Sequence, residues 1–502
     1  MVDQVFVDDT IKQLIEKYRV VWAIGHAQAL MGWDSETYMP REGAKERSVA
    51  RAELSVLSQQ LTLRPELLEL LEEAKKKVDS LNPYEKGVVR VLDRTVTRLK
   101  KLPPEHVYEY TRVTGEAVHV WVEAKQKSYF SLFKPYLEKI VDLARKTAEY
   151  LGYEKHPYNA LLDIYEEGLT IDDMDKVFDT IIPHSKKVLE KVLSDDYYPS
   201  EHPLEKVSYD REKMEKVNKE ILDLLGFPWD RARLDVSPHP FTVNMGIKDV
   251  RITTRYEGVD FKRTVYSVIH EFGHALYELQ VDERLAMTPI AGGVSLGVHE
   301  SQSRFWENIV GRSMAFVALM KPILDKYLDF VREYSVEEIY RYVNTVRPSL
   351  IRVEADEVTY NFHIYLRYEI EKKLISEELT VDEVPVEWNN MMEKLLGVRP
   401  KNDAEGVLQD IHWSHGTIGY FPTYTLGNVV AAQIKKRIES EKRLEDLISQ
   451  GQEGIASLKE ELRKLVHVWG STYPPKDLIK MATGEELNPE YFNQYLSSKY
   501  LR

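Results

Sequence analysis

Two histidines four residues apart, with a glutamate directly after the first, stand out in "TVYSVIHEFGHALYELQ" (residues 264–280). Side chains four apart on a helix lie one above the other, so the imidazoles of His270 and His274 can reach one cation. Glu271 lies about 100° round the helix from His270, where it can act as general base for metal-activated water. The spacing predicts the centre of a metal-dependent hydrolase.

A catalytic zinc site needs a third protein ligand besides one open position. The segment "SLGVHESQSRFWENIVGRS" (residues 295–313) indicates a second helix, and its Glu300 follows His274 at a spacing that allows helix, loop and return. The chain has no cysteine, so its metal ligands are imidazole, carboxylate and water. We expect Glu300 to complete the ligand set; the alternative for this residue is an ion pair with Arg304, four positions on.

The helix that carries the two histidines must bury its opposite face. At about 100° per residue, the apolar positions of this segment form one stripe, and both histidines fall on the other side. The stripe consists of Val265, Val268, Ile269, Phe272, Leu276 and Leu279.

Most of the remaining chain also has helical periodicity. We expect helices over residues 8–31, 41–62, 84–101, 136–151, 207–225, 336–346, 350–375 and 425–449. Alternation in "FTVNMGIKDVRITTRYEG" (residues 241–258) predicts two short antiparallel strands just before the histidine helix. No segment resembles a flexible linker, so we expect one catalytic domain over residues 1–502, which can divide into two lobes around a groove.

Composition narrows the class of protein. The 502 residues carry a formal net charge of −14, which argues against general binding of nucleic acid. No run of about 18 apolar residues is present, and the first residues are acidic where a secretory signal is basic. A soluble cytoplasmic protein without a membrane or nucleic-acid partner is expected, and high Lys and Glu content without cysteine is typical of heat-stable proteins.

Several further motifs occur in order along the chain. They are "ALMGWDSETYMPREGAKERS" (29–48), "HPF" (239–241), "DVRIT" (249–253), "HEFGH" (270–274), "HESQSRFWEN" (299–308), "IRVEADEVTYNFH" (351–363) and "GYFPTYTLGN" (419–428). Together they resemble the carboxypeptidase Taq family of metallocarboxypeptidases. The resemblance implies a mainly helical peptidase fold with a deep central groove, similar to neurolysin and angiotensin-converting enzyme. It also implies one zinc or cobalt ion per chain, held by His270, His274 and Glu300, and a homodimer.

An enzyme that acts at a free C-terminus must recognise a carboxylate, for which arginine offers two parallel donors. Arg352 is our first choice for this role, and Arg251 the second. The alternative for each arginine is a structural ion pair, Arg352 with Glu354 or Asp356, and Arg251 with Asp249.

Peptide hydrolysis also develops an oxyanion that needs hydrogen-bond donors. By resemblance to related helical peptidases, His412 and a tyrosine, Tyr424 before Tyr420, would stabilise this charge or hold the substrate. His239 is a candidate for lining the groove, although a histidine between two prolines is as often structural. Asp356 and Glu307 are both candidates to accept a hydrogen bond from a metal-ligating imidazole.

These observations predict a metallocarboxypeptidase that hydrolyses the C-terminal bond of peptides, with Glu271 as general base. One alternative is a zinc oligopeptidase or dipeptidase that uses the same metal site. A second alternative, from another class, is a helical scaffold whose histidine motif binds no metal.

Overall fold

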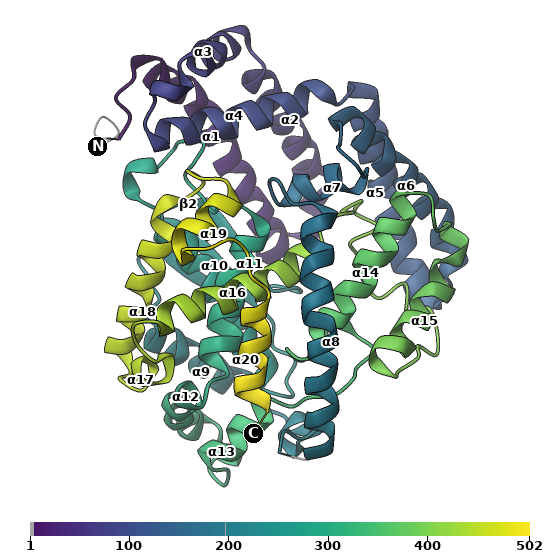
Figure 1. Cartoon of the computed structure of the whole chain (residues 1–502), viewed down its shortest axis with the longest axis vertical. Coiled ribbons are helices and arrows are strands. Elements are labelled where there is room, and N and C mark those ends of the chain that lie inside the picture. Colours follow the sequence, from purple (N-terminus) through teal and green to yellow (C-terminus); the bar gives the residue numbers. More distant parts are fainter. Residues whose placement is uncertain (1–4, 196, 502) are drawn as a thin grey trace. The chain divides into compact units, whose positions relative to one another are not determined.

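The computed structural model describes residues 5–195 and 197–501 of the chain (Figure 1). Helices dominate, and one small sheet of three strands lies in the middle of the sequence. The chain forms two compact units, each made of three segments. Unit 1 comprises Met1–Leu99, Pro203–Val343 and Ile434–Leu487, and unit 2 comprises Lys100–His202, Asn344–Gln433 and Asn488–Arg502. The expectation of a mainly helical fold is confirmed.

Unit 1 contains the sheet and helices from three separate segments of the chain. Its helices are α1 (Asp9–Thr37), α2 (Ala44–Thr62), α3 (Pro65–Lys76), most of α4 (Pro83–Lys101), α9 (Arg211–Leu225), α10 (Lys262–Leu279), α11 (Leu296–Arg304), α12 (Met314–Tyr327), α13 (Val336–Val343), α17 (Leu444–Ile448), α18 (Gln452–Leu465) and α19 (Pro475–Thr483). A π-helical segment, Phe305–Gly311, continues α11 without a break.

The described residues of unit 2 form helices joined by loops, and they include no strand. Its helices are α5 (Pro104–Lys127), α6 (Phe130–Leu151), α7 (Tyr158–Tyr165), α8 (Ile171–Asp195), α14 (Tyr360–Ile375), α15 (Val384–Leu396), the larger part of α16 (Pro422–Glu439) and α20 (Glu490–Tyr500). Its long segment between α15 and α16 has only turns.

The sheet is mixed, with strand order β1-β3-β2. Strands β2 (Thr242–Gly246) and β3 (Asp249–Thr254) pair antiparallel, as residues 241–258 predicted. A third strand, β1 (Ala232–Val236), was not predicted, and it pairs parallel with β3. The sequence gives little sign of β1, because this five-residue strand is stabilised by its pairing with β3 rather than by its own pattern.

Helix α10 packs against β3, α11 and the π-helical segment. All six residues of its predicted apolar stripe are buried, whereas His270 and His274 remain partly exposed. The phase of the stripe therefore placed the two imidazoles correctly.

One predicted helix begins later than expected. Residues 350–375 were expected to be helical throughout, but Arg352–Glu354 form a single 3₁₀ turn and α14 begins at Tyr360. The carboxylate of Asp356 accepts hydrogen bonds from the backbone N–H groups of Val358 and Thr359. This cap favours a helix start after Asp356 over continuation through it.

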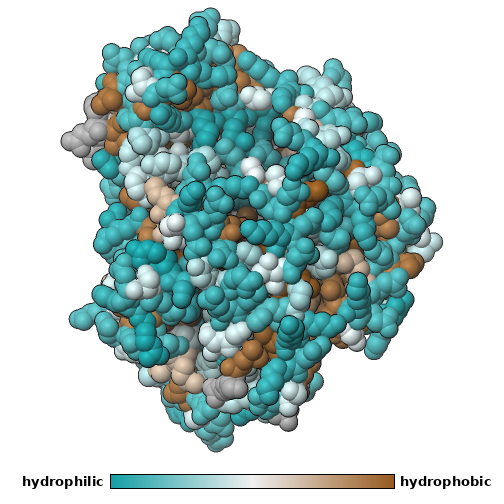
Figure 2. All heavy atoms as spheres, viewed as in Figure 1, coloured by the Kyte–Doolittle hydropathy of each residue, from teal (hydrophilic) through white to brown (hydrophobic). Residues whose placement is uncertain are grey.

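Among residues 5–195 and 197–501, no helix combines the length and the apolar character needed to cross a bilayer. The face drawn in Figure 2 is mostly hydrophilic, with hydrophobic residues scattered in small groups.

Candidate metal centre

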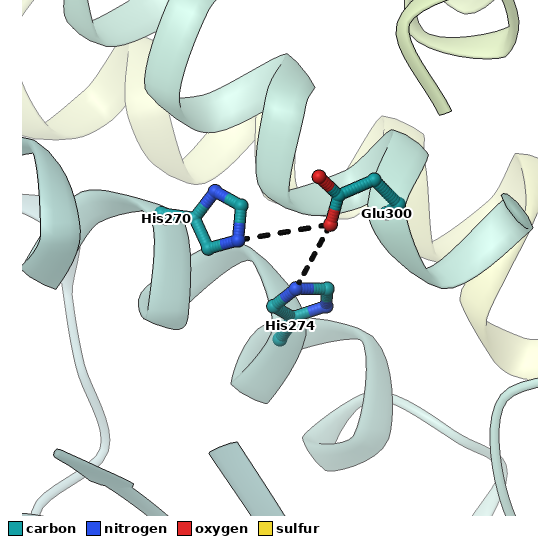
Figure 3. A group of neighbouring side chains, drawn as sticks. All are labelled: His270, His274 and Glu300. Carbon is teal, nitrogen blue, oxygen red and sulfur yellow. Dashed lines mark ion pairs between the residues drawn. The ribbon is translucent and has the colours of Figure 1, made fainter. Parts of the chain in front are cut away.

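The predicted ligands lie together in unit 1 (Figure 3). Helix α10 provides His270 and His274, and α11 presents Glu300 to them. Oε2 of Glu300 lies 3.7 Å from Nε2 of His270 and 3.3 Å from Nε2 of His274. One candidate ligand atom from each residue thus lies within 4.8 Å of the others. Two imidazole nitrogens and one carboxylate oxygen fit a divalent transition metal of the zinc type.

Gly273 allows the two ligand-bearing helices to approach this closely. A Cβ atom at this position would lie 2.5 Å from the carbonyl oxygen of Gln302 and 2.6 Å from Cα of Ser303. Both atoms belong to the backbone of α11 and cannot move aside independently. The glycine inside the histidine motif therefore sets the position of Glu300 relative to α10.

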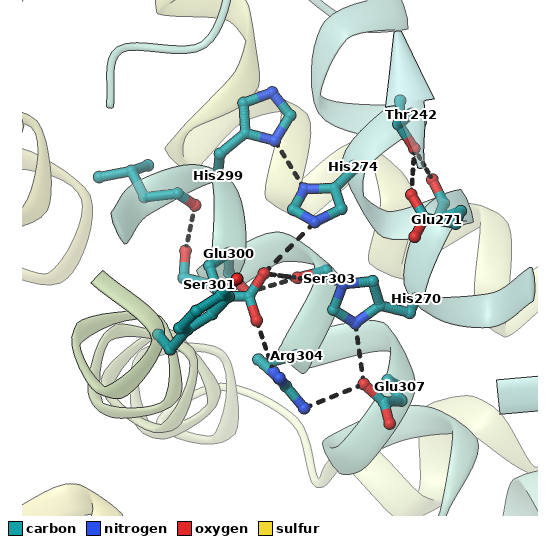
Figure 4. A network of polar contacts seen from close by, with 12 residues as sticks. Thr242, His270, Glu271, His274, His299, Glu300, Ser301, Ser303, Arg304 and Glu307 are labelled. Atoms are coloured by element: carbon teal, nitrogen blue, oxygen red, sulfur yellow. Dashed lines mark hydrogen bonds and ion pairs between the residues drawn. The ribbon is translucent and has the colours of Figure 1, made fainter. Parts of the chain in front are cut away.

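Each histidine uses its other ring nitrogen to contact a partner (Figure 4). Nδ1 of His270 lies 2.9 Å from Oε2 of Glu307, and Nδ1 of His274 lies 2.7 Å from Nδ1 of His299. Nε2 of His299 in turn lies 2.6 Å from Oε1 of Glu278. These contacts turn both Nε2 atoms towards Glu300, as partners of metal-ligating histidines do.

The π-helical segment positions Glu307, one of two acceptors that the sequence suggested. Asp356, the other, caps α14 in unit 2. Sequence reasoning missed His299 and Glu278 as supporting residues. The available signals were that His299 directly precedes Glu300 and that Glu278 lies one helical turn beyond His274.

Arg304 pairs with both carboxylates of the site, Glu300 and Glu307, and influences the pKa of each. Burial raises the pKa of Glu300, but Arg304 and the two histidines outweigh it and hold this pKa well below its ordinary value. Burial acts likewise on Glu307, and Arg304 and His270 lower its pKa to about 2. Both carboxylates are therefore ionised at neutral pH and suited to interact with a cation.

The two imidazoles differ in basicity. Burial lowers the pKa of His270, but Glu300 and Glu307 reverse this effect and raise it to about 8. For His274, burial dominates and lowers the pKa to about 4. Of the pair, His274 is the more readily available as a neutral ligand.

Glu271 lies beside the ligand set without belonging to it. Its side chain is buried, and Oε2 accepts a hydrogen bond of 2.6 Å from the hydroxyl of Thr242 on β2. Burial raises the pKa of Glu271. A carboxylate with a raised pKa is a better proton acceptor, which suits general-base chemistry.

Arg352 lies in unit 2, almost wholly buried, with Asp410 as its partner. Its Nε donates to Oδ1 of Asp410 at 3.0 Å, and Nη1 donates to the hydroxyl of Tyr360 at 3.0 Å. Arg367 donates to the other oxygen of Asp410 at 2.7 Å. The expected partners Glu354 and Asp356 were wrong for Arg352, because its ion pair is with Asp410, 58 residues further along the chain.

The other arginine and the groove histidine lie in unit 1. Arg251 pairs with Asp249 through two hydrogen bonds of 2.9 Å, as its structural alternative predicted, and lies over the ring of Trp33. The side chain of His239 is exposed, and its carbonyl accepts a hydrogen bond from Ser237.

His412, Tyr420 and Tyr424 lie together in unit 2. Nε2 of His412 lies 3.2 Å from the hydroxyl of Tyr424, and the His412 and Tyr420 rings are 5.4 Å apart. Burial lowers the pKa of His412 to about 3, so the imidazole is neutral near pH 7. Tyr424 also lies against the guanidinium of Arg352, 5.1 Å from ring centre to Cζ.

Comparison with known proteins agrees with this geometry. The family model described as carboxypeptidase Taq (M32) metallopeptidase matches residues 12–500. Thermostable carboxypeptidase 1 of Pyrococcus furiosus is 54% identical, covering 99% of this chain and 100% of the relative. Carboxypeptidase 1 of Bacillus subtilis is 38% identical, covering 97% of both chains.

Solved structures extend the likeness to the fold. A structure of the Pyrococcus furiosus carboxypeptidase superposes with a TM-score of 0.97 at 55% identity, covering 99% of this chain and 100% of that one. A match over nearly the whole chain includes both the histidine motif and the buried arginine cluster. The chain belongs to the carboxypeptidase Taq (M32) family of metallopeptidases and is a metallocarboxypeptidase.

Proposed function

We propose that His270, His274 and Glu300 hold one zinc or cobalt ion, and that Glu271 acts as general base in removing single residues from the C-terminus of peptides. The observation that carries this assignment is the convergence of two Nε2 atoms and one carboxylate oxygen beside a buried glutamate that ligates nothing. A bound ion of this type would polarise the peptide carbonyl and lower the pKa of water.

Glu271 handles the proton. Thr242 donates a hydrogen bond to Oε2 of this carboxylate and orients it, and the carboxylate accepts the proton from water. Burial raises the pKa of Glu271 towards neutral pH. The carboxylate can therefore accept a proton from water, and the carboxylic acid can then donate it to the leaving amine.

We assign recognition of the terminal carboxylate to Arg352. Arg352 and Arg367 share Asp410, so the three side chains carry one more positive than negative charge. An excess positive charge among buried groups favours binding of an anion, and a guanidinium can grip a carboxylate with two donors. The second choice, Arg251, is less suitable because Asp249 alone pairs with it, so this pair has no excess positive charge.

We assign stabilisation of the oxyanion to His412 and Tyr424, with Tyr420 as a substrate contact. The neutral imidazole and the phenol hydroxyl are both hydrogen-bond donors without charge of their own. His239 is assigned only a contact with substrate, since its ring is exposed.

We further propose that the enzyme is a heat-stable, cytoplasmic homodimer that forms one catalytic domain from its two units. The absence of cysteine supports a reducing compartment, and the Pyrococcus furiosus relative is named as a thermostable carboxypeptidase. Sedimentation analysis of the purified protein tests the dimer.

Product analysis on one peptide tests the reaction. Three forms are incubated with enzyme and added zinc or cobalt: the free peptide, its N-blocked form and its C-amidated form. Stepwise loss of C-terminal residues from the first two forms, with the amide intact, is expected. Cleavage of the amide at an internal bond would instead indicate an oligopeptidase.

The matched variant for this experiment is Glu271→Gln. It keeps the size of the side chain and should retain one metal ion per chain, while turnover falls by about 10²–10⁴-fold. A well-folded wild-type protein that binds no metal would overturn the assignment and favour a scaffold.

A further inference from the structure

The two carboxylate oxygens of Glu300 have different surroundings (Figure 4). Oε2 faces Nε2 of both His270 and His274. Oε1 points away from them and accepts a hydrogen bond of 2.7 Å from Nε of Arg304, one helical turn further along α11. The guanidinium is almost buried, with 14% of its side chain exposed, so water competes little for this contact.

This asymmetry has a consequence for metal binding. A carboxylate can ligate a cation through one oxygen or through both. We propose that Arg304 is a positioning residue that restricts Glu300 to a single donor oxygen, so that the protein supplies three ligand atoms and no more. Restriction to three leaves the remaining coordination positions for water and substrate, which a catalytic site requires. The inference rests on the proposed function, because it takes Glu300 as a ligand.

Arg304 is itself held in place by a second carboxylate. Its Nη1 donates to Oε2 of Glu307 at 3.3 Å, and the same oxygen lies 2.9 Å from Nδ1 of His270. Arg304 therefore links the partner of one histidine to the third ligand. The spacing of four residues back to Glu300 and three residues on to Glu307 brings both carboxylates to the same side of the helix.

The neighbouring hydroxyl of Ser303 does not replace Arg304 in this role. Ser303 Oγ lies 3.0 Å from Oε2 of Glu300, but it lies closer, at 2.7 Å, to the backbone carbonyl oxygen of Glu300. Ser303 thus donates mainly to a backbone carbonyl, whereas the charge-assisted hydrogen bond from Arg304 holds Oε1 on the side away from the two Nε2 atoms.

Arg312 provides a matched control for charge. It donates to Oε1 of Glu307 at 3.2 Å, and its guanidinium lies over the ring of Tyr266. Arg312 has the same charge and a nearby position, and it donates to Glu307 and to the backbone carbonyl of Val343. Removing Arg312 therefore tests the effect of positive charge near the centre separately from the effect on Oε1.

The experiment reconstitutes wild type, Arg304→Met, Arg304→Lys and Arg312→Met with cobalt(II). Two quantities are measured: the visible absorption per bound ion and the dissociation constant by competition with a chelator. Visible absorption of cobalt(II) weakens as the coordination number rises, so it reports how many donor atoms surround the ion. Arg304→Gln replaces Arg304→Met if the latter does not fold.

We expect a severalfold loss of absorption in Arg304→Met without weaker binding of cobalt, because Oε1 becomes a second donor. Arg304→Lys and Arg312→Met should keep the wild-type absorption. An unchanged spectrum in Arg304→Met, or an equal change in Arg312→Met, would overturn this inference and leave the proposed function intact. So would a cobalt affinity about 10–100-fold lower in Arg304→Met, which indicates loss of orientation instead. Failure of the wild-type protein to bind cobalt would overturn the proposed function as well.

Discussion

The Nδ1 atoms of His274 and His299 face each other at 2.7 Å. One of them must carry the proton and the other must accept it. Nε2 of His299 lies 2.6 Å from Oε1 of Glu278. Burial raises the pKa of Glu278, but its contacts with His299, the backbone of Gly293 and Asn244 together outweigh burial and lower this pKa. Nε2 of a neutral His299 therefore carries the proton, its Nδ1 accepts, and His274 presents an unprotonated Nε2 to a metal.

Replacing His299 should consequently weaken metal binding. His299→Leu removes the acceptor that fixes the tautomer of His274, and we expect the zinc affinity to fall by about 10–100-fold. Glu278→Gln, which keeps an acceptor oxygen for His299, should lose less. Equilibrium dialysis measures both constants, and equal affinities in wild type and His299→Leu would contradict the tautomer assignment.

Gly273→Ala should destabilise the protein and separate the two ligand-bearing helices. The added methyl group would meet the backbone of α11 at 2.5 Å, and overpacking of this kind costs about 1–3 kcal/mol. Gly25→Ala on α1 is the matched control, since a Cβ there meets nothing within 4 Å. Its free energy of unfolding should rise by up to about 1 kcal/mol. Denaturant unfolding and metal titration are carried out on both variants. The changes in the free energy of unfolding should have opposite signs in the two.

The choice between the two arginines can be decided by kinetics. Arg352→Lys keeps the charge but loses the paired donors, so kcat/KM for free-acid peptides should fall by about 10²-fold or more. Arg251→Lys should lower kcat/KM less, because Asp249 on the same strand already neutralises the charge of Arg251. Both variants are assayed with one peptide series after circular dichroism confirms folding. The reverse order of effects would assign the carboxylate to Arg251.

Glu371 should make the stability of the protein depend on pH. This buried carboxylate on α14 accepts hydrogen bonds from Tyr158, Trp413 and the backbone of Gly419. Burial raises its pKa from 4.5 to about 7 despite these donors. The folded chain holds this proton more tightly than the unfolded chain, so the contribution to stability is full below pH 4.5 and is lost as the pH rises through about 7.

The comparison of wild type with Glu371→Gln isolates this contribution. The stability of wild type relative to the variant should decrease by up to about 3 kcal/mol between pH 4 and pH 8. Glu369→Gln, which removes a partner of Lys372 from the same helix, is the control for loss of one acid. Thermal midpoints are measured at intervals of pH, and a difference that stays constant for Glu371→Gln would contradict the raised pKa.

Local pattern was sufficient to predict the centre of the site. The spacing of His270 and His274 and the phase of their helix are properties of consecutive residues, and both are confirmed. Glu300 required only a second helix at a suitable distance. Its ion pair with Arg304 is confirmed and its other oxygen lies beside the histidines, while its role as a metal ligand stays a prediction.

Contacts between distant segments could not be predicted in this way. Asp410 pairs with Arg352 across 58 residues, and β1 exists because β3 supplies its hydrogen bonds. Such pairs depend on how the chain returns on itself, which a single sequence does not specify residue by residue. The late start of α14 was also not predicted. Hydrogen bonds to the Asp356 side chain stop the helical pattern locally, and periodicity over a long segment does not detect such a contact.

In the π-helical segment Phe305–Gly311, each backbone hydrogen bond spans five residues, whereas it spans four in an α-helix. Glu307 lies within this segment, and from there it contacts Nδ1 of His270. Stabilisation of this protein by regularising its helices should leave these seven residues unchanged, because Glu307 supports a candidate metal ligand from within an irregular segment.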